Sequence, residues 1–123
     1  MSPDEPIIVT STPVSAEVLR RLVGAFFDDM VKFEVDLGTG RIAVGGELHA
    51  DGEALLLEQG SRQEDLWGGN FYPDRAGDDR IEFTSLINIR PSQGNRSMLI
   101  ESLEIRIRVR SLALALLAPE SAE

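Results

Sequence analysis

Alternating ionisable side chains near the middle of the chain are the first candidates for chemistry. Glu47, His49 and Asp51 are each separated by one residue, and alternate side chains of an extended strand point to the same side. Two carboxylates and an imidazole on one side could bind a metal ion or transfer protons. His49 is the single histidine, so Glu47 and His49 are the candidate catalytic pair. In the structural alternative, Asp51 caps a helix and His49 is an ordinary residue at a strand end.

A second candidate site combines the end of a strand pattern with the loop that follows it, residues 91–97. The candidate ligand-binding residues are Asn88, Arg90, Gln93, Asn95 and Arg96. Gly94 allows backbone amides to turn inward, and arginine forks bind phosphate or carboxylate, so the segment predicts an anion site. In the structural alternative, the arginines pair with nearby carboxylates, for which the candidates are Glu47, Glu64 and Asp65.

Trp67 is the single tryptophan and a third candidate for contact with a ligand. Its indole ring could stack on a ligand ring. Packing in or beside the core is the more common role of a tryptophan, and both roles stay open at this point.

Hydrophobic periodicity predicts the elements that must position these residues. Strands are expected at 6–10, 31–37, 42–49, 66–72 and 80–90, with a glycine turn at 38–40. Helices are expected from Ser15 or Thr12 to Phe26, from Asp51 to Gly60, and over 103–118. The order βαββαββα, with strands that have one apolar and one polar face, favours an α+β fold. We expect a mostly antiparallel five-strand sheet with its helices on one face.

Length and composition predict one domain over residues 1–123, with frayed tails at 1–6 and 119–123. The chain has no cysteine, and its acidic, proline-broken start is unlike a signal peptide. The longest apolar run, 112–118, is far shorter than a membrane span. These features favour a cytoplasmic location without a membrane. The net charge of −9 makes nucleic acid an unlikely partner, because phosphate binding needs a basic face.

The final helix is apolar on nearly all sides between Leu112 and Leu117. A helix with this pattern is buried, either in its own core or against a partner. A homodimer through the 103–118 helix and packing across the protein's own sheet are therefore both open.

Several stretches of the chain resemble a family of short bacterial and archaeal proteins known as domain of unknown function 5674. They are Phe27 to Lys32, Gly45 to Asp51, Gln63 to Gly68, and Ile87 to Ser97. The resemblance covers residues 26–97 and implies no particular activity. Two features depart from it: Asp28 stands where a glycine is typical, and the final helix is more apolar.

The donors on the polar sheet face and in the loop 91–97 favour a binding module for a small anionic molecule. One alternative is a hydrolase or lyase in which Glu47 or His49 is the general base and Arg90 stabilises negative charge. The other is a dimeric component of a protein complex. The sequence names no cofactor, and any metal would be held by Glu47, His49 and Asp51.

Overall fold

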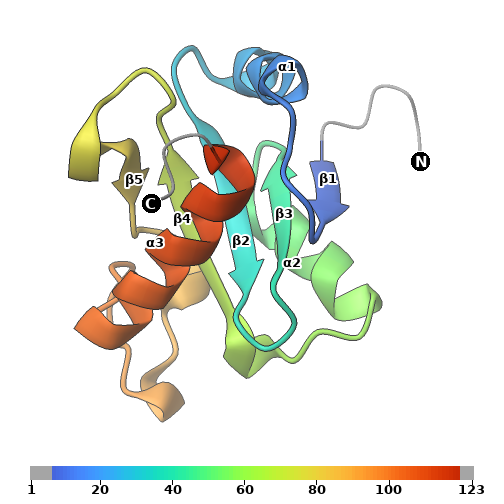
Figure 1. Cartoon of the computed structure of the whole chain (residues 1–123). Coiled ribbons are helices and arrows are strands. Elements are labelled where there is room, and N and C mark those ends of the chain that lie inside the picture. Colours follow the sequence, from blue (N-terminus) through green and yellow to red (C-terminus); the bar gives the residue numbers. More distant parts are fainter. Residues whose placement is uncertain (1–6, 120–123) are drawn as a thin grey trace.

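The computed structural model describes residues 7–119, which form one five-stranded sheet and three α-helices (Figure 1). The strands are β1 (Ile7–Thr10), β2 (Val31–Asp36), β3 (Arg41–Gly45), β4 (Leu66–Phe71) and β5 (Ile81–Glu82). The helices are α1 (Ala16–Phe26), α2 (His49–Glu58) and α3 (Leu103–Leu117). The sheet order is β1-β3-β2-β4-β5, and all neighbours are antiparallel. The predicted α+β fold with a five-strand antiparallel sheet is confirmed. The predicted tails lie outside the described residues, except for Pro119.

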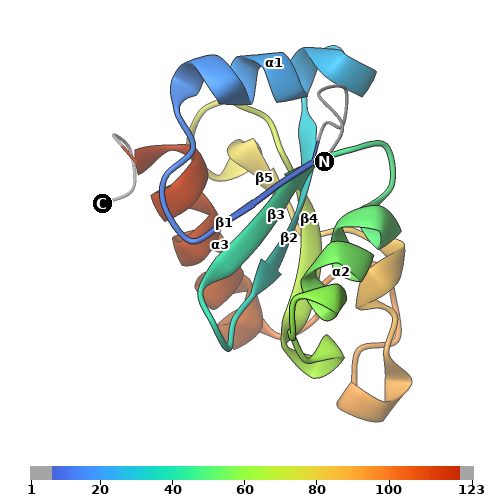
Figure 2. The same cartoon turned by 90° about the vertical axis from the view of Figure 1, so that its right-hand side faces the viewer.

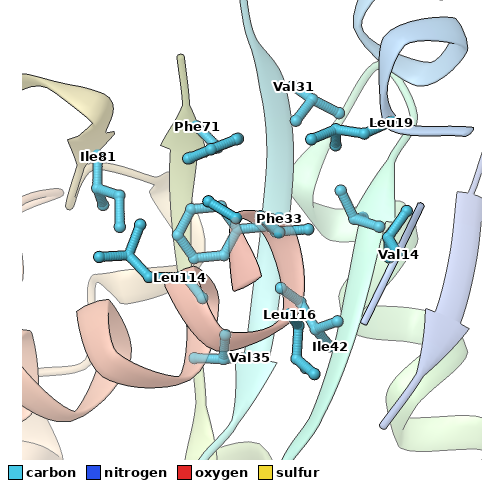
Figure 3. Packing of buried hydrophobic residues seen from close by; sticks show 14 of the residues in the cluster. Val14, Leu19, Val31, Phe33, Val35, Ile42, Phe71, Ile81, Leu114 and Leu116 are labelled. Carbon is cyan, nitrogen blue, oxygen red and sulfur yellow. The ribbon is translucent and has the colours of Figure 1, made fainter. Parts of the chain in front are cut away.

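The main core lies on the sheet face that receives the odd-numbered side chains of β2. Val31, Phe33 and Val35 are almost completely buried there, as their alternation predicts. Leu19 of α1 and Leu114 of α3 belong to the same apolar cluster (Figure 3). Burying one such side chain contributes about 1.5–3 kcal/mol, so this face fixes α1 and α3 on the sheet.

The two helices over the main core begin at serine caps. The Ser15 hydroxyl accepts a hydrogen bond from the Val18 amide at 3.2 Å, and Ser102 does the same for Ile105 at 3.2 Å. Helix α3 buries its C-terminal half in the protein's own core through Ala113, Leu114, Leu116 and Leu117. Within residues 7–119, every helix falls short of the length and apolar character that crossing a bilayer requires.

Helix α2 lies on the opposite side of the sheet from α3 (Figure 2), so the expectation that all helices share one face is wrong. A small second cluster made by Leu56 of α2 with Ile7, Ala43 and Leu66 anchors it. Strand alternation identifies an apolar face, but it does not reveal that a partly polar face is also covered. Glu34, on the polar side of β2, therefore lies beneath α2.

The strand predicted over 80–90 is wrong beyond its first residues. Strand β5 ends at Glu82, and residues 86–88 form a 3-10 turn. The Ser85 hydroxyl accepts a hydrogen bond from the Ile87 amide at 3.2 Å and starts this turn. Asn88 then bonds to the backbone of Gly68 through its side chain, where a strand would pair through its backbone. The apolar alternation of 81–89 therefore reflects a turn packed beside β4.

Candidate functional site

The structure does not bring Glu47, His49 and Asp51 onto one strand face. Strand β3 ends at Gly45, and α2 begins at His49, so the strand predicted through His49 is wrong. His49 is buried, whereas Glu47 and Asp51 are exposed. Asp51 does not cap α2 either, because the N-cap position is Leu48 and lacks a side-chain bond. Within residues 7–119, no group of three or more acidic, histidine or cysteine side chains could hold a metal ion.

His49 is a neutral side chain in the interface between α2 and β4. Its Nε2 lies 2.8 Å from the carbonyl oxygen of Gly69, to which a neutral imidazole donates its proton. Burial lowers the pKa of His49 to about 4, against the hydrogen bond to Gly69, which raises it. The imidazole is therefore uncharged at neutral pH, and its contact with β4 helps to hold the first turn of α2.

Arg90 joins the loop 91–97 to the start of β4. Its guanidinium donates hydrogen bonds to the carbonyl oxygens of Gln63 and Leu66. The same group lies over the ring of Trp67, 4.2 Å from the centroid. Arg90 is only 9% exposed, and burial lowers its pKa. Trp67 is buried in the main core cluster, which is the structural role left open by the sequence.

Two buried asparagines complete a network around Arg90. Asn88 accepts a hydrogen bond from the Gly68 amide at 2.9 Å and donates to the carbonyls of Gly68 and Met98, each at 3.0 Å. Asn95 donates to the Asn88 carbonyl at 2.8 Å and accepts from the Glu101 amide at 2.8 Å. These side chains are bonded to the backbone, so their contacts are those of a structural network.

The remaining two candidates of the loop are exposed. Gln93 donates to the Glu64 carbonyl at 3.0 Å. The backbone amides of Arg96 and Ser97 donate to one carboxylate oxygen of Glu101 at 2.8 and 3.0 Å, and these bonds lower the pKa of Glu101. The loop therefore already binds an anionic group, which is a carboxylate of its own chain.

Sequence reasoning missed a buried acid beneath α2. Glu34 belongs to the polar side of the β2 alternation, but α2 covers it and leaves it 0% exposed. Its two carboxyl oxygens are without a hydrogen-bond partner among the described residues. Burial, followed by the negative charge of Glu53, raises its pKa well above the ordinary value of a glutamate. Gly52, an unusual residue inside a helix, was the available signal, because only a glycine leaves room for this carboxyl.

Asp36, on the same face of β2, is a buried acid that has hydrogen-bond donors. The Ser61 hydroxyl donates to it at 2.5 Å, and the amides of Gly38 and Thr39 donate at 2.8 and 3.1 Å. Burial alone would raise its pKa, but the hydrogen bonds outweigh this effect and lower it. The Asp36 carboxylate therefore stabilises the turn after β2, whereas the Glu34 carboxyl has no hydrogen bond in the described part of the chain that would stabilise a charge.

A cavity of about 760 Å³ opens between α1, the 73–80 segment and the end of α3. Its apolar lining includes Leu19, Val23, Phe71 and Leu117. Its charged lining consists of three arginines and two aspartates, Arg20, Arg75, Arg80, Asp28 and Asp74. None of these residues was a candidate in the sequence. They come from segments far apart in the chain, and the only local signal was the turn-rich character of 73–80.

Two of the three arginines of this cavity, Arg75 and Arg80, are positioned by local contacts. The Arg75 guanidinium stacks 3.6 Å from the ring centroid of Tyr72, whose hydroxyl donates to Glu82 at 2.6 Å. Arg80 donates through Nε to the Gly77 carbonyl at 3.1 Å. Small-molecule sites combine apolar lining with polar groups that orient the ligand, and this cavity has both kinds of lining residue.

Fold and cavity together define a small α+β protein with an antiparallel sheet covered on both faces and a cavity lined by both apolar and charged side chains. The chain belongs to the family described as protein of unknown function (DUF5674), whose model matches residues 7–116. This match confirms the family resemblance seen in the sequence. Comparisons with curated proteins and with solved structures give no match.

Proposed function

We propose that the protein is a binding module for a small molecule that has an apolar body and an anionic group. The observation that carries this proposal is the cavity of about 760 Å³ between α1, the 73–80 segment and α3. Its volume falls within the range of roughly 300–1,000 Å³ that is typical of ligand pockets. The apolar lining suits a hydrocarbon or aromatic group of the ligand.

The charged lining residues give the proposed specificity for an anion. Arg20, Arg75 and Arg80 outnumber the aspartates Asp28 and Asp74 in the lining. Guanidinium groups bind carboxylate or phosphate through paired N–H donors. A ligand with its apolar part against α1 and α3 would have its anionic group near these arginines.

The anion site predicted in the loop 91–97 and the catalytic pair Glu47 and His49 stay predictions. Asn88, Arg90 and Asn95 are buried with backbone partners, and His49 is bonded to Gly69. Because these side chains already have partners, the proposal is based on the cavity beside α1 and not on the loop 91–97. A cytoplasmic location also stays a prediction of the sequence.

Substituting the arginines that line the cavity tests the proposed pocket. Octanoate, titrated by calorimetry at pH 7, is expected to bind, whereas octanol is expected to bind at least tenfold more weakly because it lacks the charge. Arg20→Gln and Arg80→Gln are each expected to weaken octanoate binding about tenfold. Arg21→Gln is the matched control, because Arg21 is an exposed arginine of α1 outside the cavity lining. Equal binding of octanoate and octanol, or an equal loss in Arg21→Gln, would contradict the proposal.

A second candidate function, assembly with another copy of the chain, is favoured by the first two turns of α3. Leu103 and Ile107 lie one turn apart and are 66% and 59% exposed. The apolar end of α3, on which the homodimer prediction was based, is buried in the protein's own core. The proposed dimer surface is therefore the N-terminal half of the helix.

The oligomeric state tests this second candidate. Sedimentation equilibrium is expected to give a dimer mass for the wild type and a monomer mass for Ile107→Glu, which adds a charge to the proposed interface. Arg108→Gln, at an exposed neighbouring position, makes the net charge more negative by the same one unit and controls for the change in charge. A monomeric wild type at a concentration of about 1 mM would rule out a dimer tighter than millimolar affinity.

A further inference from the structure

Helix α2 buries few apolar side chains against the sheet. Among its ten residues, only His49, Gly52 and Leu56 are buried. Its N-cap residue makes no side-chain hydrogen bond to the first turn. Gly46 before the helix and Gly60 after it have φ values of 86° and 100°, in the region where glycine moves without steric cost. An element with few buried contacts and permissive ends opens at a low free-energy cost.

The carboxyl of Glu34 lies directly against the backbone of this helix. A Cβ atom on Gly52 would overlap Oε1 of Glu34, so the carboxyl fills the space above the glycine. The partners of Glu34 in the sheet register are Ala43 on β3 and Gly68 on β4, which carry no charge. Neither carboxyl oxygen has a hydrogen-bond partner within residues 7–119. The carboxyl is thus enclosed without any hydrogen-bond donor from the described residues that would stabilise its ionised form.

The charged groups around Glu34 do not compensate for its burial. Glu53 and Asp51 on α2 both oppose a negative charge on Glu34, and Lys32 on β2 favours it. The remaining titratable neighbour on α2 is His49, which is neutral at pH 7. A buried carboxylate without partners costs several kcal/mol, and access to water removes this cost. Moving α2 away supplies that water without disturbing the main core, which lies on the other face of the sheet.

We propose that α2 is a hinged cover over the polar face of the sheet, closed while Glu34 is protonated and opened when Glu34 loses its proton. The glycines at 46 and 60 are the hinges, and the contact between Glu34 and Gly52 is the trigger. Opening uncovers Glu34, the imidazole of His49 and the Gly69 carbonyl that His49 binds. This inference does not depend on the proposed pocket, which lies at α1 and α3.

Hydrogen exchange of the α2 amides, compared between the wild type and Glu34→Gln, tests the cover. The opening constant is the exchange rate divided by the intrinsic rate at each pH. In the open state, Glu34 titrates near its ordinary pKa, so ionisation increases opening by up to tenfold per pH unit above about pH 4.5. The wild-type opening constant divided by that of Glu34→Gln is expected to rise at least tenfold from pH 5 to pH 8. His49 titrates in both proteins and cancels from this ratio.

Two controls separate the cover from other causes of exchange. Glu58→Gln removes an exposed acid of the same helix and is expected to leave the pH dependence as in the wild type. The β2 and β4 amides are expected to show no rise in the same ratio. A constant α2 ratio, or an equal rise in β2 and β4, would overturn the proposal.

If Glu34→Gln fails to fold, carbon-13 NMR of the wild-type side-chain carboxyl gives an independent result. The Glu34 signal is expected to titrate with a midpoint clearly above that of exposed glutamates. A midpoint equal to theirs would overturn the proposal.

Discussion

Replacing Asn88 with alanine is expected to lower the free energy of unfolding by about 3–5 kcal/mol. Asn88 is completely buried, and its amide serves the N–H and carbonyl of Gly68 and the carbonyl of Met98. Alanine leaves these backbone groups without that partner, at a cost of roughly 1–3 kcal/mol for each buried group. Urea denaturation at pH 7, followed by the fluorescence of Trp67, measures the loss.

Gln93→Ala is the matched control for this experiment. Gln93 is exposed, and within residues 7–119 its side chain makes one hydrogen bond, to the Glu64 carbonyl at 3.0 Å. Its loss is expected to cost less than about 1 kcal/mol. A cost of the same small size for Asn88→Ala would mean that the network around the loop 91–97 does not hold this segment. The structural account of Asn88 and Arg90 would then be wrong.

Lowering the pH from 7 to 4 is expected to remove about 3 kcal/mol of stabilisation that depends on His49. Burial lowers the pKa of His49 to about 4 in the folded protein, whereas the unfolded chain has a value near 6.5. As the pH falls below 6.5, the unfolded chain takes up the proton first. The stabilisation is therefore complete above about pH 6.5 and is lost as the pH falls through about 4.

Comparison with His49→Gln isolates this effect. Glutamine can still donate to the Gly69 carbonyl but does not titrate. The free energy of unfolding of the wild type minus that of His49→Gln is expected to fall by about 3 kcal/mol between pH 7 and pH 4. Acidic groups titrate in both proteins, so their contributions cancel. A difference that does not change with pH would show that His49 is accessible to protons in the folded state.

Local patterns predicted the elements whose formation depends mainly on the neighbouring sequence. The alternation of Val31, Phe33 and Val35 predicted β2 and its core face, and the glycine turn at 38–40 predicted the β2–β3 hairpin. Thr12 and Ser15 were the two predicted caps of the first helix, and Ser15 is the one that caps α1 through its hydroxyl. In each case, one periodicity or one cap is enough to specify the element.

The errors arose where contacts between distant segments decide the conformation. Residues 80–90 have the alternation of a strand, but Asn88 bonds to the backbone of β4, about twenty residues earlier, and holds a turn. Glu34 has the position of a solvent-facing residue, and α2 covers it. Neither outcome follows from periodicity, because both depend on which segment packs on the second sheet face.

No pattern in the sequence predicted the proposed pocket either. Arg20 belongs to α1, whereas Arg75 and Arg80 belong to a segment more than fifty residues later, and Leu117 is near the end of α3. No spacing motif links these positions. The predicted loop site had adjacent donors, but adjacency in the chain also suits a network that bonds to its own backbone, as Asn88 and Asn95 do.

The location of ligand binding is the most direct test of the account. Octanoate is titrated into nitrogen-15-labelled protein at pH 7, and backbone amide shifts are followed by NMR. The proposed pocket predicts saturable shifts around the cavity, at Leu19, Gly24, Ala76 and Gly77, and unchanged amides in the loop 91–97. Saturable shifts confined to the loop 91–97, or no saturable shifts at 10 mM octanoate, would contradict the proposed function.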